Sequence, residues 1–194
     1  QSDNVYVAGS SQNANGDRDF TVVKYNAQGA QQWVYRKDGS AQGFDEAVSI
    51  HVVNSNEVYI GGYIQNSTTA KDGLLVKLDA NGAEVWTQEF ELGNNGNENI
   101  VGLTGDNNGN IYVAYNEFYN LQNTLHINSI APNGSVNWTF DKTLESEVKA
   151  LDFNDNLDAL VVAGCQKTSG VGNDIYVSLL DAGTGNALKE VKKD

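Results

Sequence analysis

The sequence predicts an all-β chain in which one unit of short strands is repeated about four times. The first observation is the spacing of the tryptophans Trp33, Trp86 and Trp138, which are 53 and 52 residues apart and each stand four residues after the glycine of a tight turn. The second is that residues 5–10 (VYVAGS) superpose without a gap on residues 58–63 (VYIGGY). The third is that the apolar runs are short and lie between Asn, Asp and Gly clusters, as β-strands require.

A repeat of this length with several short strands is typical of β-propeller blades. We therefore expect four-stranded antiparallel sheets at about 50–53 residues per repeat, forming an arc of about four blades of a larger propeller. The third copy follows the second at the same spacing, whereas the fourth is degenerate and places Lys189 where the tryptophan would stand. The chain is read as one propeller segment, 1–194, with approximate repeats 1–44, 45–97, 98–146 and 147–194.

The second copy shows the expected strands most clearly. Its inner strand is expected at 47–53, followed by strands at 57–64 and 73–79 and an outermost strand at 83–90. The Asn and Gly turns between them suit antiparallel hairpins, because these residues accept a positive φ. The third strand does not alternate between apolar and polar residues, which predicts a sheet covered on both faces.

Each tryptophan is expected to pack between adjacent blades, because an indole buries a large apolar area. The recurrent Asp19, Asp72 and Asp174 stand just before the third strand of their copies, where a carboxylate is expected to accept N–H bonds from the turn.

The strand count predicts an incomplete first blade. The chain opens on a second strand, so three strands are expected in the first copy and four in each of the others, fifteen in all. We expect these residues to belong to a propeller of seven or eight blades, or to half of one built from two chains. Terminal blades expose apolar faces, which predicts association with further blades or a second chain.

Composition excludes several classes of partner. Twelve basic and 25 acidic residues give a net charge of −13, which argues against nucleic acid and anionic membrane surfaces. The apolar runs are too short for a transmembrane helix. The single Cys165 forms no internal disulfide and is expected to be a buried small residue. The chain has no Met and no signal peptide, so we read it as a mature or excised segment of an exported, extracellular or cell-surface protein.

The segments DEAVSIHVVNSNEVYIGGYI (45–64) and DGLLVKLDANGAEVW (72–86) resemble the bacterial β-propeller repeats known as SBBP repeats. The resemblance implies a secreted or cell-surface scaffold and no set of catalytic residues. The turns LDANGAEVW and LLDAGTGNALK are similar, more loosely, to quinoprotein blades. The cofactor site of those enzymes needs an adjacent cysteine pair, and this chain has one cysteine, so we expect no quinone cofactor.

Two groups of residues in the sequence suggest a metal site. His51 and His126 lie in non-equivalent positions of different blades without a third ligand, and we interpret both as structural histidines and not as a zinc site. Residues 13–19 (NANGDRD) and 152–158 (DFNDNLD) place oxygen-bearing side chains at alternate positions, as calcium loops do. Calcium is therefore a hypothesis for these hairpins, and otherwise no cofactor is expected.

Acidic residues recur just before each inner strand, near the rim where propellers bind ligands. They are Asp45, Glu46, Glu98, Glu145 and Glu147. As a group they would suit a cationic or sugar ligand, whereas repeated turn chemistry explains them without a ligand. We take Asp45, Glu46, Glu98 and Glu147 as the candidate ligand-binding residues.

The function predicted from these features is that of a non-catalytic, secreted or surface binding module or scaffold for protein or glycan. One alternative is a secreted carbohydrate-active enzyme that uses the rim carboxylates, which predicts an acid pair converging in one pocket. Another is a structural component of a surface appendage or secretion assembly, which predicts a large lateral interface.

Overall fold

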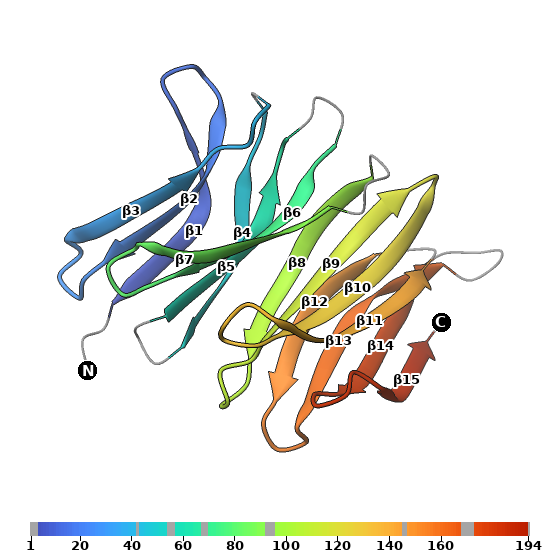
Figure 1. The fold of residues 1–194 in the computed structure, drawn as a ribbon. Helices are drawn as coiled ribbons and strands as arrows, with labels where there is room; N and C mark the ends of the chain where they lie inside the picture. The colour runs from blue at the N-terminus through green and yellow to red at the C-terminus, as the bar shows by residue number, and fades with distance from the viewer. Residues whose placement is uncertain are drawn as a thin grey trace. The chain divides into compact units, whose positions relative to one another are not determined.

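The computed structural model describes residues 4–41, 43–53, 57–66, 70–91, 96–144, 147–167 and 173–193. Within these ranges the chain forms fifteen strands in four antiparallel sheets and no helix (Figure 1). The all-β fold and its three- and four-stranded blades are therefore confirmed. The described part of the chain also contains no helix long and apolar enough to span a membrane.

The four sheets follow one another along the chain. The first has the order β1 (Val5–Gln12), β2 (Arg18–Tyr25), β3 (Gln31–Lys37). The second has the order β4 (Glu46–Val53), β5 (Glu57–Ile64), β6 (Asp72–Leu78), β7 (Glu84–Phe90). The third consists of β8 (Asn97–Gly105), β9 (Ile111–Tyr119), β10 (Gln122–Ile130) and β11 (Val136–Leu144). The fourth consists of β12 (Val148–Asn154), β13 (Ala159–Lys167), β14 (Asn173–Asp181) and β15 (Ala187–Lys193).

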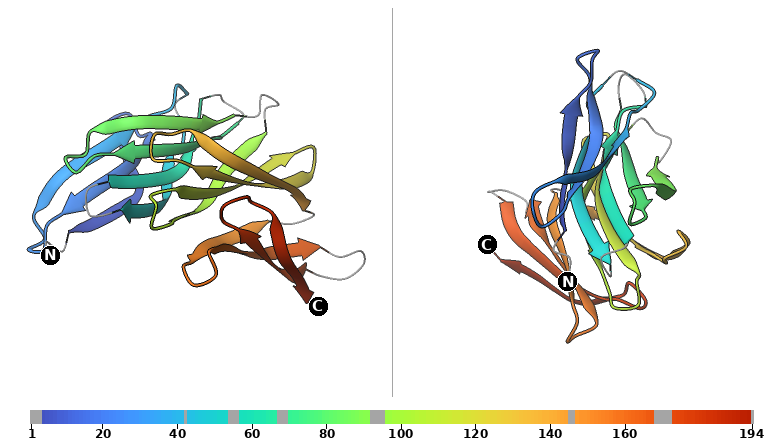
Figure 2. Two further views of the ribbon diagram at one scale, coloured as in Figure 1. Left: turned by 60° about the horizontal axis from the view of Figure 1, so that its bottom comes forward. Right: turned by 90° about the vertical axis from the view of Figure 1, so that its left-hand side faces the viewer.

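The chain divides into two compact units, residues 1–99 and residues 100–194. In the first unit β1 lies beside β4, and in the second β9 lies beside β12 (Figures 1 and 2). The second strand of one blade thus contacts the inner strand of the next. We call these two contacts the first junction, between β1 and β4, and the second junction, between β9 and β12.

The hairpin before each outermost strand has the same backbone. Its glycine, Gly29, Gly82, Gly134 or Gly185, has φ between 74° and 89°, a conformation that glycine adopts without a Cβ clash. In every sheet the register then shifts where the outermost strand begins to pair with its neighbour, between Lys24 and Tyr25 in the first. The repeated turn sequence therefore produces a repeated turn and bulge.

Burial of the third strands agrees with their lack of alternation. Every residue of β6 is buried, as expected for a strand without alternating polar residues. Each unit has its own apolar core, which includes Phe20, Ile60 and Leu74 in the first and Leu125 and Tyr176 in the second. The blades thus share cores with their neighbours, as expected for a repeat protein.

Two of the tryptophans pack against the turn of the next blade, as predicted. Trp33 Nε1 donates to Ala80 O at 3.1 Å, and a Cβ added at Gly82 would lie 2.6 Å from the indole. Trp138 makes the same contact with Ala182 O at 2.9 Å. Gly82 and Gly185 therefore have two roles. They adopt the positive φ of the turn, and they leave room for an indole from the preceding blade.

The register also explains the fourth copy. Trp138 pairs with Ser129 just before the bulge, and Lys189 pairs with Leu179 at the same place in the last sheet. Lys189 thus occupies the tryptophan position in a strand that still pairs as the others do. Cys165, which was expected to be buried, is half-buried in β13.

Candidate binding site

A pocket of about 250 Å³ lies in the first unit at the start of β4, and we call it the β4 pocket. It is lined by Ser10, Arg18, Phe44, Asp45, Glu46, Tyr63 and Lys71. Asp45 and Glu46 are two of the four candidate residues predicted from the sequence. The volume is somewhat below the roughly 300–1,000 Å³ of pockets that hold drug-sized ligands, so the pocket suits a small ligand.

Backbone pairing between the blades holds the β4 pocket in place. Arg18, at the start of β2, forms a parallel bridge with Phe44, and Asp45 N donates to Arg18 O at 2.8 Å. Gln65 approaches the same segment so closely that a Cβ at Gly43 would lie 2.0 Å from its Oε1. A glycine at position 43 therefore allows the segment that carries Phe44 to lie against the end of β5.

Asp45 is a structural carboxylate. It is fully buried, its Oδ2 accepts Gly39 N at 2.7 Å, and its Oδ1 accepts Gln65 N at 2.7 Å. Burial raises the pKa of Asp45, and the two backbone N–H bonds offset only part of this effect. Because both carboxylate oxygens are engaged, Asp45 joins two connecting segments and shapes the wall of the pocket.

Glu46 and Tyr63 form a polar pair on another wall. Tyr63 OH donates to Glu46 Oε2 at 2.9 Å. Burial, reinforced by this bond and by the charge of Glu46, raises the pKa of Tyr63 to about 12, so the phenol is neutral at physiological pH. Lys71 Nζ lies 3.8 Å from the centre of the Tyr63 ring, a cation–π contact.

Phe44 gives the pocket an exposed aromatic surface. The side chain is 57% exposed, and the guanidinium carbon of Arg18 lies 5.5 Å from its ring centre. The exposed ring thus lies among the charged side chains that line the pocket. The β4 pocket therefore combines an aromatic platform with hydrogen-bond donors and acceptors.

The structure sorts the candidate carboxylates into two kinds of position. Asp45 N bonds to Arg18 O, and Glu98 N bonds in the same way to Lys71 O at 2.9 Å, so these two acids are equivalent, and both are buried. Glu46 and Glu147 are the other equivalent pair, because the carbonyl oxygen of each closely approaches the glycine opposite, Gly62 or Gly164.

The members of the second pair are exposed and have different partners. Glu46 lines the β4 pocket, whereas Glu147 forms an ion pair with Lys149. The structure brings Asp45 and Glu46 together in the pocket. Glu98 and Glu147 are not among the residues that line it, and Glu145 lies outside the described residues.

The second junction differs from the first at the position that lines the pocket. Ser10 of β1 corresponds to Asn116 of β9 in the repeat. Asn116 Nδ2 donates to Val148 O at 2.9 Å, and Val148 N donates to Asn116 Oδ1 at 3.2 Å. The longer amide side chain thus bonds to the next inner strand, whereas the short Ser10 borders a cavity.

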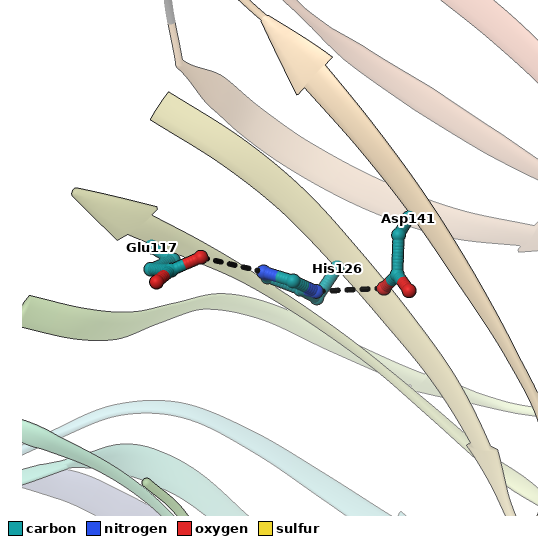
Figure 3. Close-up of polar contacts among 3 residues, drawn as sticks. All are labelled: Glu117, His126 and Asp141. Atoms are coloured by element: carbon teal, nitrogen blue, oxygen red, sulfur yellow. Dashed lines mark hydrogen bonds and ion pairs between the residues drawn. The ribbon is translucent and has the colours of Figure 1, made fainter. Parts of the chain in front are cut away.

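A second polar group lies on the third sheet and is shown in Figure 3. His126 Nδ1 lies 2.7 Å from Asp141 Oδ1, and its Nε2 lies 3.3 Å from Glu117 Oε2. The imidazole also stacks on Tyr115 with a centre distance of 4.8 Å. Both ring nitrogens are engaged by carboxylates, which agrees with a structural role for His126. His51 is half-buried, and burial lowers its pKa.

Arg18, Phe44, Tyr63 and Lys71 were not predicted as site residues. Arg18 and Lys71 are related by the 53-residue shift and each precede an aspartate of the third strand, Asp19 or Asp72. The recurrence of a basic residue at this position could have identified Arg18 and Lys71 as candidate site residues. The exposure of Phe44 and the position of Tyr63 had no counterpart in the repeat pattern.

Comparisons with known proteins define the class of this chain as a β-propeller-like protein. The quinohemoprotein alcohol dehydrogenase from Comamonas testosteroni is similar at 15% identity with a TM-score of 0.64, over 91% of this chain and 32% of that one. Drosophila plexin A, solved in complex with semaphorin 1b, is similar at 10% identity with a TM-score of 0.51, over 89% of this chain and 39% of that one.

This chain therefore spans about a third of the length of these solved chains, and the likeness concerns the fold alone. No family model and no curated protein matches the sequence.

Proposed function

We propose that this protein is a non-catalytic binding module, secreted or held at a cell surface, that binds a glycan in the β4 pocket. The observation that carries the proposal is the exposed Phe44 ring beside Arg18, Glu46 and Lys71. Sugar rings offer apolar C–H faces that pack on aromatic rings, and hydroxyls that both donate and accept hydrogen bonds. A pocket with an aromatic platform, two cationic donors and a carboxylate acceptor meets both requirements.

The balance of charge in the pocket favours a hydroxyl-rich ligand over a strongly charged one. Arg18 and Lys71 are opposed by Asp45 and Glu46, so the pocket has no large net charge although the protein carries −13. A polycation would meet two like charges, and a polyanion would be repelled by the protein as a whole. A neutral sugar avoids both penalties.

The hydrogen bonds of Asp45 favour binding over catalysis. A carbohydrate-active enzyme needs two carboxylates that reach the substrate, one as an acid and one as a base or nucleophile. Both oxygens of Asp45 already accept backbone N–H groups, which leaves Glu46 as the accessible carboxylate of this pocket. One accessible carboxylate suits recognition better than glycoside cleavage.

The test is binding of methyl glycosides to the purified protein, measured by saturation-transfer NMR and then by calorimetry. A panel of neutral, amino and acidic monosaccharide methyl glycosides gives the preferred sugar. Phe44→Ala is expected to weaken binding about two- to twelvefold, if stacking on this ring contributes what an aromatic pair does, about 0.5–1.5 kcal/mol. Phe118→Ala is the matched control, because Phe118 is similarly exposed but lies in the second unit.

Two results would overturn the glycan assignment. One is the absence of saturable binding by any glycoside of the panel to folded wild-type protein, which would favour a protein partner. The other is equal loss of binding in Phe44→Ala and Phe118→Ala, which would place the sugar elsewhere. A signal peptide encoded upstream of Gln1 tests export independently of the ligand.

A further inference from the structure

We propose that the β1–β2 hairpin and the segment after β3 form a calcium site with Asp17, Asp19 and Asp38 as ligands. Each of these residues offers one carboxylate oxygen, and the three oxygens lie within 4.8 Å of one another. Asp17 and Asp19 flank the start of β2, and Asp38 directly follows the end of β3. An ion bound here would join two segments of the first sheet.

One carboxylate oxygen of Asp17 is buried and has no hydrogen-bond partner. Asp17 Oδ1 accepts Arg18 N at 2.8 Å, whereas Asp17 Oδ2 is closed off from solvent and accepts no hydrogen bond. Buried carboxylate oxygens normally accept a hydrogen bond or bind a cation, because desolvation otherwise costs free energy. A cation shared with Asp19 and Asp38 satisfies this oxygen.

The nearby basic side chains do not neutralise the three carboxylates. Arg18 stands between Asp17 and Asp19 in the sequence, but its guanidinium lies over the Phe44 ring. Lys37 precedes Asp38, but its Nζ pairs with Glu84 at 3.3 Å. Among the described residues no ion pair involves any of the three aspartates. Three carboxylates so close together repel one another unless a cation lies between them.

The dimensions and chemistry of the cluster favour calcium. Calcium binds oxygens at about 2.3–2.6 Å, so two ligands on opposite sides of the ion are up to about 5 Å apart, which agrees with the observed separation. Magnesium binds oxygens at about 2.0–2.1 Å and usually keeps several of its waters, so it is less suited than calcium to a site of three carboxylates. The cluster contains no His or Cys, the ligands that copper and zinc favour. Beside Asp17, a cavity of about 220 Å³ gives room for water ligands.

The other calcium hypothesis, residues 152–158, serves as an internal control. Its Asp and Asn residues alternate in the same way, but among the described residues it gives no comparable group of three carboxylates. Asp152 Oδ1 accepts Phe153 N at 2.9 Å, the same local bond that Asp17 Oδ1 accepts from Arg18 N. The alternating Asp and Asn pattern is thus present in both segments. In the first sheet a third aspartate, Asp38, also lies close to the two of the hairpin.

The experiment titrates calcium chloride into the chelator-treated, dialysed full chain by calorimetry, with magnesium chloride in a parallel titration. The wild type is expected to bind one calcium per chain with a Kd of about 0.1–1 mM, and magnesium about tenfold more weakly. Asp38→Asn removes an exposed ligand and is expected to weaken calcium binding about tenfold or more. Asp152→Asn is expected to bind as the wild type does.

Thermal melts separate a ligand role from a structural role. In chelator, Asp38→Asn is expected to melt at or above the wild-type temperature, because it removes a like charge from the cluster. In calcium, the wild type gains stability and Asp38→Asn does not. Lack of saturable calcium binding to folded wild type up to about 10 mM, or equal calcium responses of wild type and Asp38→Asn, overturns the proposal.

Discussion

The first and second junctions are built from the same repeat but differ in how the space between the blades is filled. In both, an indole from one blade lies on the glycine of the next blade's turn. At the second junction Asn116 adds two hydrogen bonds to Val148, whereas at the first junction the shorter Ser10 borders the β4 pocket. The difference teaches that the tryptophan contact is common to both junctions, whereas the side chain at the Ser10 or Asn116 position determines whether the second strand bonds to the next inner strand.

The largest expected effect comes from removing the Asn116 side chain. Asn116→Ala leaves the backbone N–H and C=O of the buried Val148 without their partners. Each unsatisfied buried group costs about 1–3 kcal/mol, so losing both partners should lower the free energy of unfolding by about 2–6 kcal/mol. Urea denaturation followed by circular dichroism measures it. A loss below about 0.5 kcal/mol would mean that water replaces the amide at this junction.

The next expected effect comes from placing at the first junction the residue type that is found at the second. Ser10→Asn is expected to place an amide against the start of β4, closing the β4 pocket and stabilising the fold by about 0.5–1.5 kcal/mol. The same variant should therefore lose glycan binding while its melting temperature rises. Ser135→Asn changes a serine that is also exposed but lies outside the pocket, and it controls for the substitution itself. Retention of wild-type affinity would show that the ligand does not enter beside Ser10.

The smallest expected effect is a difference in acid response between the units. Burial raises the pKa of Asp106 in the second unit, but bonds from Asn110, Tyr112 and Asn108 outweigh burial and leave its pKa below the usual value. Its contribution to stability is therefore present above the unfolded-state pKa and is lost as the pH falls through the lower folded-state pKa. The pKa of Asp45 in the first unit is raised, so its contribution instead grows as the pH falls.

Amide hydrogen exchange between about pH 5 and pH 3 measures this difference strand by strand. Protection of β9 and β10 should decrease on acidification, and Asp106→Asn should flatten the decrease, with an effect under about 1 kcal/mol. An unchanged acid response in Asp106→Asn would assign the loss to other carboxylates of the second unit.

Much of the fold was predictable because its signals are local and repeated. The tryptophan spacing, the Asn and Gly turns and the unbroken apolar third strands gave the sheets and the contact of Trp33 with the next blade. Even Lys189 was placed correctly at the position of a missing tryptophan. These features depend either on residues within one hairpin or on the contact between a hairpin and its equivalent in the next repeat.

The site was only partly predictable. Asp45 and Glu46 were identified from their recurrence, but the sequence could not show that Asp45 is buried and bonded while Glu46 is accessible. Phe44 has no counterpart in the repeat that marked it as an exposed platform. Its environment depends on how closely Gln65 approaches Gly43, and no local pattern encodes that approach.

The sequence by itself determined the unit of this protein: its period, its strands, its turns and the residues that join one blade to the next. Local backbone preferences and apolar periodicity are properties of short segments, and repetition makes them readable. Only the tertiary structure decided which equivalent carboxylates are buried, where a pocket remains, and that Asp38 meets Asp17 and Asp19. Those outcomes depend on contacts between residues about 20 to 50 positions apart, where close packing of the whole fold determines which side chains meet.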